Sequence, residues 1–228
     1  MLKKGNIAID GPAGAGKSTV AKLIAKKLGY LYVDTGAMYR ALAWKALQEK
    51  FSYQDVKNII KLAQKTEIVL TKSKHTSAQK VFCDGFDVTE EIRTPEVSEF
   101  VSQIAQIPEV REVFLHQQRK FAKDGNVVMD GRDIGSNVLP DAAHKFFLTA
   151  SLEERTKRRY NELKCKGYNL TMEQIRQDIA RRDQLDSKRK AAPLVKALDA
   201  VEIDTSNLSP RQVASVIENI IKGESYDL

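Results

Sequence analysis

Short apolar segments alternate along most of the chain with longer stretches in which hydrophobic residues recur every three to four positions. The longer stretches are typical of amphipathic helices, and the short segments are typical of strands that are buried on both faces. This alternation predicts an α/β fold in which helices flank a parallel sheet. We assign five strands to this sheet, at residues 7–10, 31–34, 127–130, 146–149 and 201–204.

Polar residues stand at the ends of these predicted strands. Four strands end in an aspartate, and the fifth ends in Thr149, which Ala150 and Ser151 follow. Ligands of open α/β sheets bind beyond the carboxyl ends of the strands. The polar residues at this edge are therefore candidates for a functional site.

Capping residues mark the ends of several predicted helices. Thr94 and Ser209 each precede a proline, which is the pattern of an N-cap followed by proline in the first helical position. Ser151 and Thr171 each stand three residues before a glutamate or a glutamine, a spacing that predicts a capping box. Gly29 is expected to follow the end of a helix that begins near the first glycine-rich loop.

Two stretches interrupt the alternation of strands and helices. Residues 67–71 and 81–88 are short apolar runs, and the second contains Asp84-Gly85, a sequence typical of a type I′ hairpin turn. These runs predict a small antiparallel sheet inserted between the second and third core strands. The other stretch, residues 151–167, predicts a strongly basic helix.

A candidate phosphate-binding loop follows the first predicted strand. Residues 11–18 match the pattern G-x-x-x-x-G-K-[ST], which arises by chance in a chain of this length roughly once in a hundred sequences. The strand before the loop and the helix after it are the context that this motif requires. Its backbone N–H groups cradle phosphate oxygens, and the following helix adds the partial positive charge of its N-terminus.

We predict that this loop binds ATP. Lys17 is expected to reach the β- and γ-phosphates, and Ser18 is expected to help bind Mg²⁺. The loop alone is compatible with a P-loop NTPase or a kinase, and a GTPase is disfavoured because the sequence has no N-K-x-D base-recognition motif. The predicted ATP-binding residues are Gly11, Pro12, Ala13, Gly14, Ala15, Gly16, Lys17, Ser18 and Thr19.

A second anion-binding pattern follows the second strand. Residues 34–40 read Asp-Thr-Gly-Ala-Met-Tyr-Arg, so a helix begins with an aspartate and a hydroxyl, and Arg40 follows one turn later. A phosphate placed there would meet a helix N-terminus and a guanidinium group. An ordinary N-cap with a solvated arginine would give the same pattern, and this segment alone does not separate the two interpretations.

The segment 34–40 resembles the D-[ST]-G-A-x-Y-R signature of bacterial cytidylate kinases, with Thr35 where the family often has serine. Residues 131–135, Gly-Arg-Asp-Ile-Gly, and the pattern Arg-Arg-Asp…Asp…Arg…Ala-Pro-Leu over residues 181–194 resemble the same family. The resemblance covers essentially the whole chain, including the long insertion of the bacterial form.

This resemblance implies a P-loop nucleoside monophosphate (NMP) kinase built from three parts. A core comprises residues 1–35, 92–150 and 168–228. An NMP-binding insertion comprises residues 36–91, with an outer limit near residue 105, and contains the small antiparallel sheet. A short helical lid comprises residues 151–167.

The resemblance also implies roles for individual residues. The predicted CMP-binding residues are Arg40, Arg132 and Arg189 for the phosphate, Ser102, Arg111 and Asp133 for the cytosine, Arg182 and Asp186 for the sugar hydroxyls, and Thr35 at the start of the acceptor helix. A carboxylate such as Asp133 can accept a hydrogen bond from the exocyclic amine of cytosine, whereas uracil offers a carbonyl there. Arg182, Asp186 and Arg189 share one helical face, which is also the pattern of a solvated salt-bridge stripe.

The lid segment carries three arginines on one helical face, Arg155, Arg158 and Arg159. Phosphoryl transfer depends mainly on positioning and on positive charge around the moving group. We therefore predict that these arginines act in catalysis together with Lys17 and Arg132. An exposed basic helix without such a role is the alternative.

Composition narrows the class of partner only slightly. Lysine and arginine outnumber aspartate and glutamate by 37 to 30, a net charge of +7, which suits any anionic partner. An RNA-binding or regulatory P-loop protein is thus a rival, although no RNP-type aromatic motif occurs and only 7% of residues are aromatic. Within the kinases, UMP, AMP, dTMP or a small metabolite such as shikimate are alternative acceptors.

The expected reaction is the transfer of the γ-phosphate of ATP to CMP, and to dCMP, with Mg²⁺ as cofactor. We expect a monomer in the cytoplasm with no nucleic-acid or membrane partner. No run of about 18 apolar residues occurs, the N-terminus does not resemble a secretory signal, and neither Cys83 nor Cys165 has a metal-ligand spacing. His75, His116 and His144 are expected to be structural or solvated.

Overall fold

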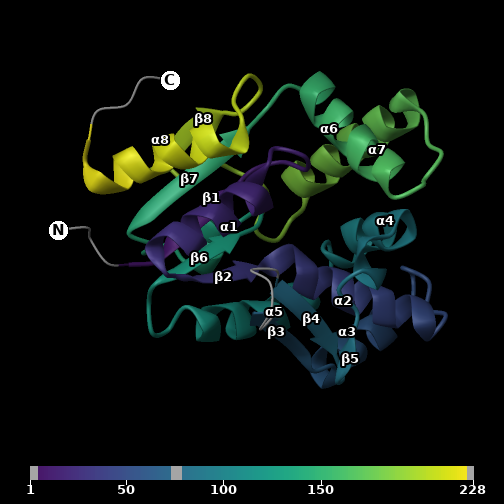
Figure 1. Ribbon diagram of the computed structural model, residues 1–228. Helices are drawn as coiled ribbons and strands as arrows, with labels where there is room; N and C mark the ends of the chain where they lie inside the picture. The colour runs from purple at the N-terminus through teal and green to yellow at the C-terminus, as the bar shows by residue number, and fades with distance from the viewer. Residues whose placement is uncertain (1–4, 73–78, 225–228) are drawn as a thin grey trace.

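The computed structural model, which describes residues 5–72 and 79–224, contains a five-stranded sheet (Figure 1). All neighbouring strands are parallel, and their spatial order is β2-β6-β1-β7-β8. The five predicted core strands are confirmed, except that β7 begins two residues earlier than expected. Their bounds are β1 Ile7–Asp10, β2 Leu31–Asp34, β6 Val127–Asp130, β7 His144–Thr149 and β8 Val201–Asp204.

Hydrophobic side chains on both faces of this sheet are buried by helices. On one face, Ile9 and Phe146 pack beneath α1 (Lys17–Leu28) and α8 (Pro210–Lys222), which lie together in Figure 1. On the other face, Ala8 and Met129 pack against the end of α5 (Pro108–Phe121) and the π-helical turn η2 (Ile134–Val138). Burial on both faces explains why the central strands β1 and β6 are apolar up to their final aspartate, whereas the edge strand β8 alternates and exposes Glu202 and Asp204.

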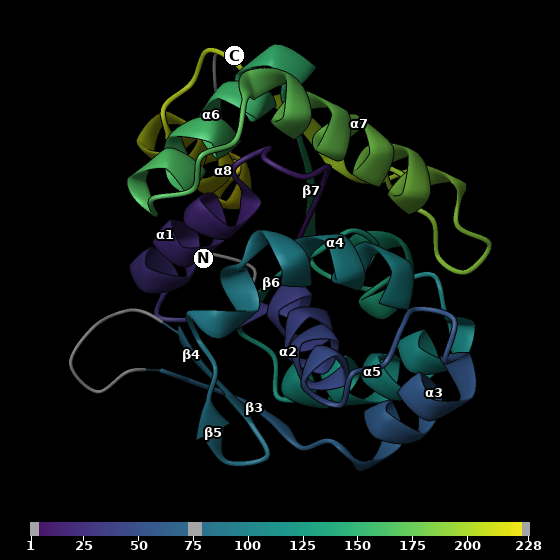
Figure 2. The same ribbon diagram turned by 90° about the vertical axis from the view of Figure 1, so that its right-hand side faces the viewer.

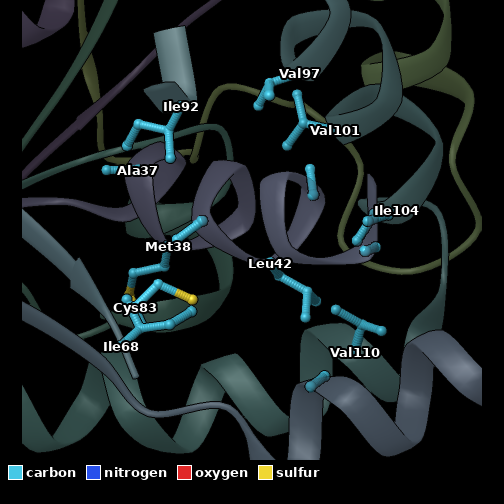
Figure 3. Close-up of a cluster of buried hydrophobic side chains, with 14 of the residues drawn as sticks. Ala37, Met38, Leu42, Ile68, Cys83, Ile92, Val97, Val101, Ile104 and Val110 are labelled. Atoms are coloured by element: carbon cyan, nitrogen blue, oxygen red, sulfur yellow. The ribbon is translucent and has the colours of Figure 1, made fainter. Parts of the chain in front are cut away.

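A second hydrophobic core lies beside the sheet and is built around α2 (Thr35–Gln48). Figure 3 shows Met38 and Leu42 of α2 surrounded by side chains from the neighbouring elements. These elements are α3 (Val56–Lys65), η1 (Glu91–Arg93), α4 (Pro95–Ile104), α5 and the small second sheet. At the α2–α5 contact, the rings of Tyr39 and Phe114 meet edge to face, with centroids 4.7 Å apart. Along the sequence, the buried residues of this core run as far as Phe114, beyond the predicted limits of the insertion. The division of the chain into domains stays a prediction.

The second sheet is the predicted antiparallel meander, with strand order β3-β4-β5. Its strands are β3 (Ile68–Lys72), β4 (Gln79–Cys83) and β5 (Phe86–Asp87). Asp84 and Gly85 both have positive φ, 49° and 84°, as a type I′ turn requires.

The Gln79 side chain ties this small sheet to the free edge of the core sheet. Its amide donates to the Tyr32 carbonyl oxygen at 2.8 Å and accepts from the Asp34 N–H at 3.3 Å. The small sheet is thereby fixed to the end of β2, where α2 begins.

Helices α6 (Leu152–Cys165) and α7 (Met172–Lys188) form a pair that packs through Leu163, Ile175 and Ile179. Figure 2 shows this pair across from α2 and α4. The predicted lid helix is α6, and its main hydrophobic partner is α7.

Most predicted helix caps are confirmed, and one differs in part. Thr94 caps α4, and complete capping boxes begin α7 at Thr171 and α8 at Ser209. The Ser151 hydroxyl accepts from the Glu154 N–H at 3.2 Å, but the reciprocal bond of a capping box is missing. The Glu154 carboxylate is bound to Arg158 instead, and the Ser151 N–H donates to another side chain.

The described residues also settle several smaller expectations. Trp44 packs against the second core, and His116 is exposed, while His75 lies outside the described residues. Cys83 and Cys165 are free thiols. Within residues 5–72 and 79–224, no helix is long and apolar enough to cross a bilayer.

We expect Phe114→Ala to lower the free energy of unfolding by about 3–5 kcal/mol, because it removes a fully buried ring from the second core. Phe86→Ala is the matched control, since the Phe86 ring is 70% exposed and its loss should cost less than about 0.5 kcal/mol. Urea unfolding of both variants measures the difference. Equal destabilisation by the two changes would contradict the described core.

Candidate active site

A cavity of about 1030 Å³ lies beyond the carboxyl ends of the core strands. Its wall combines the glycine loop after β1, the start of α2, part of α4, the turn after β6, and helices α6 and α7. Three predicted residues, Gly11, Pro12 and Arg155, are not part of this wall. Predicted residues that line it are 13–19, Thr35, Arg40, Ser102, Arg111, Arg132, Asp133, Arg158, Arg159, Arg182, Asp186 and Arg189.

The glycine loop adopts a conformation that only glycine tolerates at several positions. Gly11, Gly14 and Gly16 have φ values of 144°, 78° and 86°. A Cβ atom on Gly11 would lie 1.9 Å from the Leu148 carbonyl oxygen, so no side chain fits there. The loop is thus pressed against the neighbouring strand β7 and directs its backbone toward the cavity.

Lys17 stands at the start of α1 with its side chain buried. Its ammonium group donates to the Pro12 carbonyl oxygen at 2.7 Å. Burial, together with the charges of Arg132 and Arg182, lowers the pKa of Lys17 well below its usual value. An anion in the cavity would relieve this destabilisation of the charged lysine.

Asp130, at the end of β6, links the glycine loop to the start of α2. One carboxylate oxygen accepts from the Ser18 hydroxyl at 2.8 Å, and the other accepts from the Tyr32 hydroxyl at 2.9 Å. Its backbone carbonyl accepts from the Thr35 hydroxyl at 2.8 Å. Burial, followed by the nearby charge of Asp34, raises the pKa of Asp130 to about 6.

The Asp133 carboxylate is held by three donors. Arg111 and Asn137 donate to Oδ2 at 2.6 and 2.9 Å, and Arg189 donates to Oδ1 at 3.1 Å. Arg111 lies on α5 and Arg189 directly follows the end of α7, so Asp133 brings together Arg111, which was predicted to meet the cytosine, and Arg189, which was predicted to bind the phosphate. Sequence reasoning missed Asn137, whose only signal is its position one turn after Asp133.

Asp186 organises a second group of arginines. Arg132 donates to Asp186 at 2.8 Å, and Arg182 and Arg189 approach it at 3.9 and 3.8 Å. Burial tends to raise the pKa of Asp186, but the charges of Arg132 and Arg182 outweigh burial and lower it. A buried face of α7 therefore points into the cavity, rather than forming the solvated salt-bridge stripe that the sequence left open.

Arg40 lies among cations with little compensation. Burial, followed by the charge of Arg182, lowers the pKa of Arg40 to about 9. The charge of Asp34 opposes this shift, while Arg159 and Arg93 add to it. Within the described part of the chain, no carboxylate forms an ion pair with Arg40, which donates instead to the Ser98 hydroxyl at 2.7 Å. This concentration of positive charge marks a site for an anion.

The three arginines of α6 have different surroundings. Arg158 donates to the Thr205 carbonyl oxygen at 2.6 Å and pairs with Glu154 at 3.0 Å. Arg159 pairs with Glu162 at 2.8 Å. The buried side chain of Arg155 instead donates to the loop carbonyl of Ala13 at 3.2 Å and is paired with an aspartate of α7.

Sequence reasoning also missed Thr205, which joins the glycine loop to the end of β8. Its hydroxyl lies 3.1 Å from the Ala15 carbonyl oxygen and 3.0 Å from the Thr149 carbonyl oxygen. The same hydroxyl accepts from Arg158 at 3.0 Å. The only signal in the sequence was its place directly after the fifth strand.

The turn that carries Arg132 and Asp133 is anchored from below by Asp10. The buried Asp10 carboxylate accepts the N–H groups of Ile134 and Gly135 at 2.8 and 2.7 Å. Burial nevertheless dominates and raises the pKa of Asp10 to about 6.

Comparison with known proteins identifies the family. The cytidylate kinase family model matches residues 7–223. The chain belongs to the cytidylate kinase family. A cytidylate kinase of Caldanaerobacter subterraneus is 54% identical over 95% of this chain and 94% of its own length, and one of Bacillus subtilis is 52% identical over 99% and 100%.

A likeness in fold alone extends further. An uncharacterised protein from Eubacterium ventriosum is 13% identical, with a TM-score of 0.52 over 97% of this chain and 100% of that one. The expected class, a P-loop kinase with a five-stranded parallel sheet and a small inserted antiparallel sheet, is confirmed by the cytidylate kinase family and the observed topology.

Asp10 should give this cytidylate kinase family member a pH-dependent term in stability. The pKa of Asp10 is about 6 in the folded protein and 3.8 ordinarily. Its stabilising contribution to the free energy of unfolding is therefore fully present below pH 3.8 and is lost as the pH rises through about 6. Asn cannot ionise, so the free energy of unfolding of Asp10→Asn should rise, relative to that of the native chain, by up to about 3 kcal/mol between pH 4 and pH 7. Urea unfolding at each pH measures this, and a difference that is independent of pH would contradict it.

Proposed function

We propose that this chain transfers the γ-phosphate of ATP to CMP, giving ADP and CDP, and that it also accepts dCMP. The observation that carries this is one cavity whose wall contains two different groups of residues. The glycine loop and Lys17 line one part, and Ser102, Arg111 and Asp133 line another. The arginines between them suit two phosphate groups brought face to face.

The ATP phosphates belong at the glycine loop. Backbone N–H groups of residues 13–19, which line the cavity, and the N-terminus of α1 would surround the β- and γ-phosphates. Lys17 already lies at this position with a lowered pKa, so phosphate binding would stabilise its charged form.

CMP belongs in the remainder of the cavity. Its phosphate would meet the α2 N-terminus at Thr35 together with Arg40, Arg132 and Arg189. Its sugar hydroxyls would meet Arg182 and Asp186, and its cytosine would meet Ser102, Arg111 and Asp133. All of these residues line the same cavity, which supports the assignment.

Asp133 supplies the physical basis for choosing cytosine over uracil. Its Oδ2 is occupied by Arg111 and Asn137, whereas Oδ1 accepts, among the residues that the structure describes, from Arg189 alone. A carboxylate oxygen can accept two hydrogen bonds, so Oδ1 retains capacity for the cytosine amine. Uracil would set a carbonyl against this oxygen, and two facing acceptors cost about 1–3 kcal/mol, roughly tenfold or more in affinity.

The transfer itself needs positioning more than covalent chemistry. An oxygen of the CMP phosphate attacks the γ-phosphorus in line, and the bond from that phosphorus to the β–γ bridging oxygen breaks, which releases ADP. No general base is required, because the attacking oxygen is already anionic. Lys17, Arg132, Arg158 and Arg159 would neutralise the developing charge.

Arg155 would serve this reaction in a different way. Its guanidinium donates to the Ala13 carbonyl oxygen rather than facing the cavity. In this arrangement it fixes α6 against the glycine loop, and its part in catalysis would act through that contact.

The donor set at the loop fits Mg²⁺. The Ser18 hydroxyl and the Asp130 carboxylate are hard oxygen ligands that already lie 2.8 Å apart. Among the residues that the structure describes, no group of three or more acidic, histidine or cysteine side chains could hold a metal alone. Mg²⁺ commonly binds through one or two carboxylates plus substrate phosphates, and when bound it neutralises charge on their oxygens.

An acceptor panel tests the proposal. ADP release is measured with CMP, dCMP, UMP, AMP, dTMP and shikimate at saturating ATP and Mg²⁺. We expect the highest kcat/KM with CMP, and a value for UMP at least about tenfold lower. Faster turnover with any acceptor outside the cytidine nucleotides would overturn the assignment.

Lys17→Ala should lower kcat by at least about a hundredfold, because it removes a cation from the developing charge. Lys26→Ala is the matched control, since Lys26 lies exposed on the same helix. Both variants are assayed for CMP-dependent ADP release, and their melting curves show whether they are folded. Near-native turnover of a folded Lys17→Ala variant would contradict the proposed role.

A further inference from the structure

The hydroxyl of Ser98, on α4, lies between arginines of two other helices. Arg40 of α2 donates to its oxygen at 2.7 Å, and Arg159 of α6 approaches the same oxygen at 3.4 Å. Neither the sequence motifs nor the residues assigned above to CMP include Ser98. The hydroxyl is nevertheless the point where the acceptor helix, α4 and the lid helix meet.

The direction of the hydrogen bonds fixes what Ser98 can do. Its single proton goes to the Thr94 carbonyl oxygen at 2.9 Å, so toward both arginines the hydroxyl is an acceptor. A guanidinium group carries five N–H donors, and Arg40 donates one hydrogen bond to Ser98. The remaining donors stay available for a phosphate.

The partner of Arg40 is also uncharged, unlike the partners of the other arginines that line the main cavity. Arg132 is paired with Asp186, and Arg111 with Asp133. A carboxylate beside Arg40 would compete with an incoming phosphate for the same charge. A hydroxyl orients the guanidinium without neutralising it.

We propose that Ser98 is a positioning residue for the acceptor phosphate. It fixes the Arg40 guanidinium in the orientation that binds the phosphate of CMP and connects it to Arg159 of the lid. This inference rests on the proposed function, because it assigns Arg40 to the acceptor phosphate.

A purely structural role is the competing explanation. Serine hydroxyls in helices commonly bond to the carbonyl oxygen four residues earlier, and Ser187 of α7 makes the same bond to Asp183 at 2.7 Å. No arginine donates to the Ser187 hydroxyl among the described residues. Ser187→Ala therefore removes an equivalent helix bond and serves as the matched control.

The neighbourhood of Ser98 allows a conservative rescue. A second hollow, of about 270 Å³, adjoins the main cavity and is lined by Ser98 together with Leu163, Leu170 and Ile175. This space can receive one extra methyl group, so Ser98→Thr should keep the hydroxyl without distorting α4. Ser98→Val has the same shape as threonine and lacks the hydroxyl.

The experiment compares KM for CMP, KM for ATP, kcat and melting temperature across these variants. Ser98→Ala and Ser98→Val should raise KM for CMP about three- to tenfold while KM for ATP stays within about twofold. Ser98→Thr and Ser187→Ala should match the native chain. Ser98→Asp should raise KM for CMP further than alanine does, because its carboxylate would neutralise Arg40.

Two results would overturn the role of Ser98. One is an unchanged KM for CMP in folded Ser98→Ala. The other is a parallel rise of both KM values with a lowered melting temperature, as in a merely structural role. If the alanine variant does not fold, the threonine and valine pair decides the question. A native chain that fails to phosphorylate CMP would instead contradict the proposed function, so the two failures are distinguishable.

Discussion

The site depends on a local excess of buried positive charge that the protein neutralises only in part. Asp133 and Asp186 balance four arginines, Arg111, Arg132, Arg182 and Arg189. Arg40 keeps an uncharged partner, and the pKa of Lys17 is lowered. Burying unpaired cations costs free energy, so this arrangement is stable only if other parts of the fold contribute enough. The missing negative charge is what the phosphates of two nucleotides would supply.

The two hydrophobic cores make this arrangement possible. The sheet core fixes the strand ends and the glycine loop, and the second core fixes α2, α4 and α5 beside them. The helix pair α6–α7 belongs to neither core. Its buried apolar residues, Leu163, Ile175 and Ile179, form a separate cluster. Its ties to the rest of the site are mainly polar, such as the bonds of Arg155 and Arg158. A part held mainly by polar contacts with the substrate site is suited to respond to substrate.

Much of the architecture could be predicted because the signals were local. Strand and turn positions follow from apolar runs and from Asp84-Gly85, and the phosphate loop follows from contiguous glycines. The half-formed cap at Ser151 could not be predicted, because the Glu154 carboxylate accepts from Arg158 in the next helical turn instead of from the Ser151 N–H. Likewise, Asn137, Thr205 and Ser98 carry no motif, and their importance comes from what lies across the cavity.

The sequence by itself determined the fold class, the phosphate loop and the family, since each depends on residues close together in the chain or on motifs in a fixed order. Only the tertiary structure decided how the charges are shared. Arg155, Arg158 and Arg159 look equivalent on a helical face, yet one contacts the loop backbone and the other two face the cavity. Hydrogen-bond partners and burial depend on residues more than a hundred positions apart, and these set which arginine is free to bind an anion.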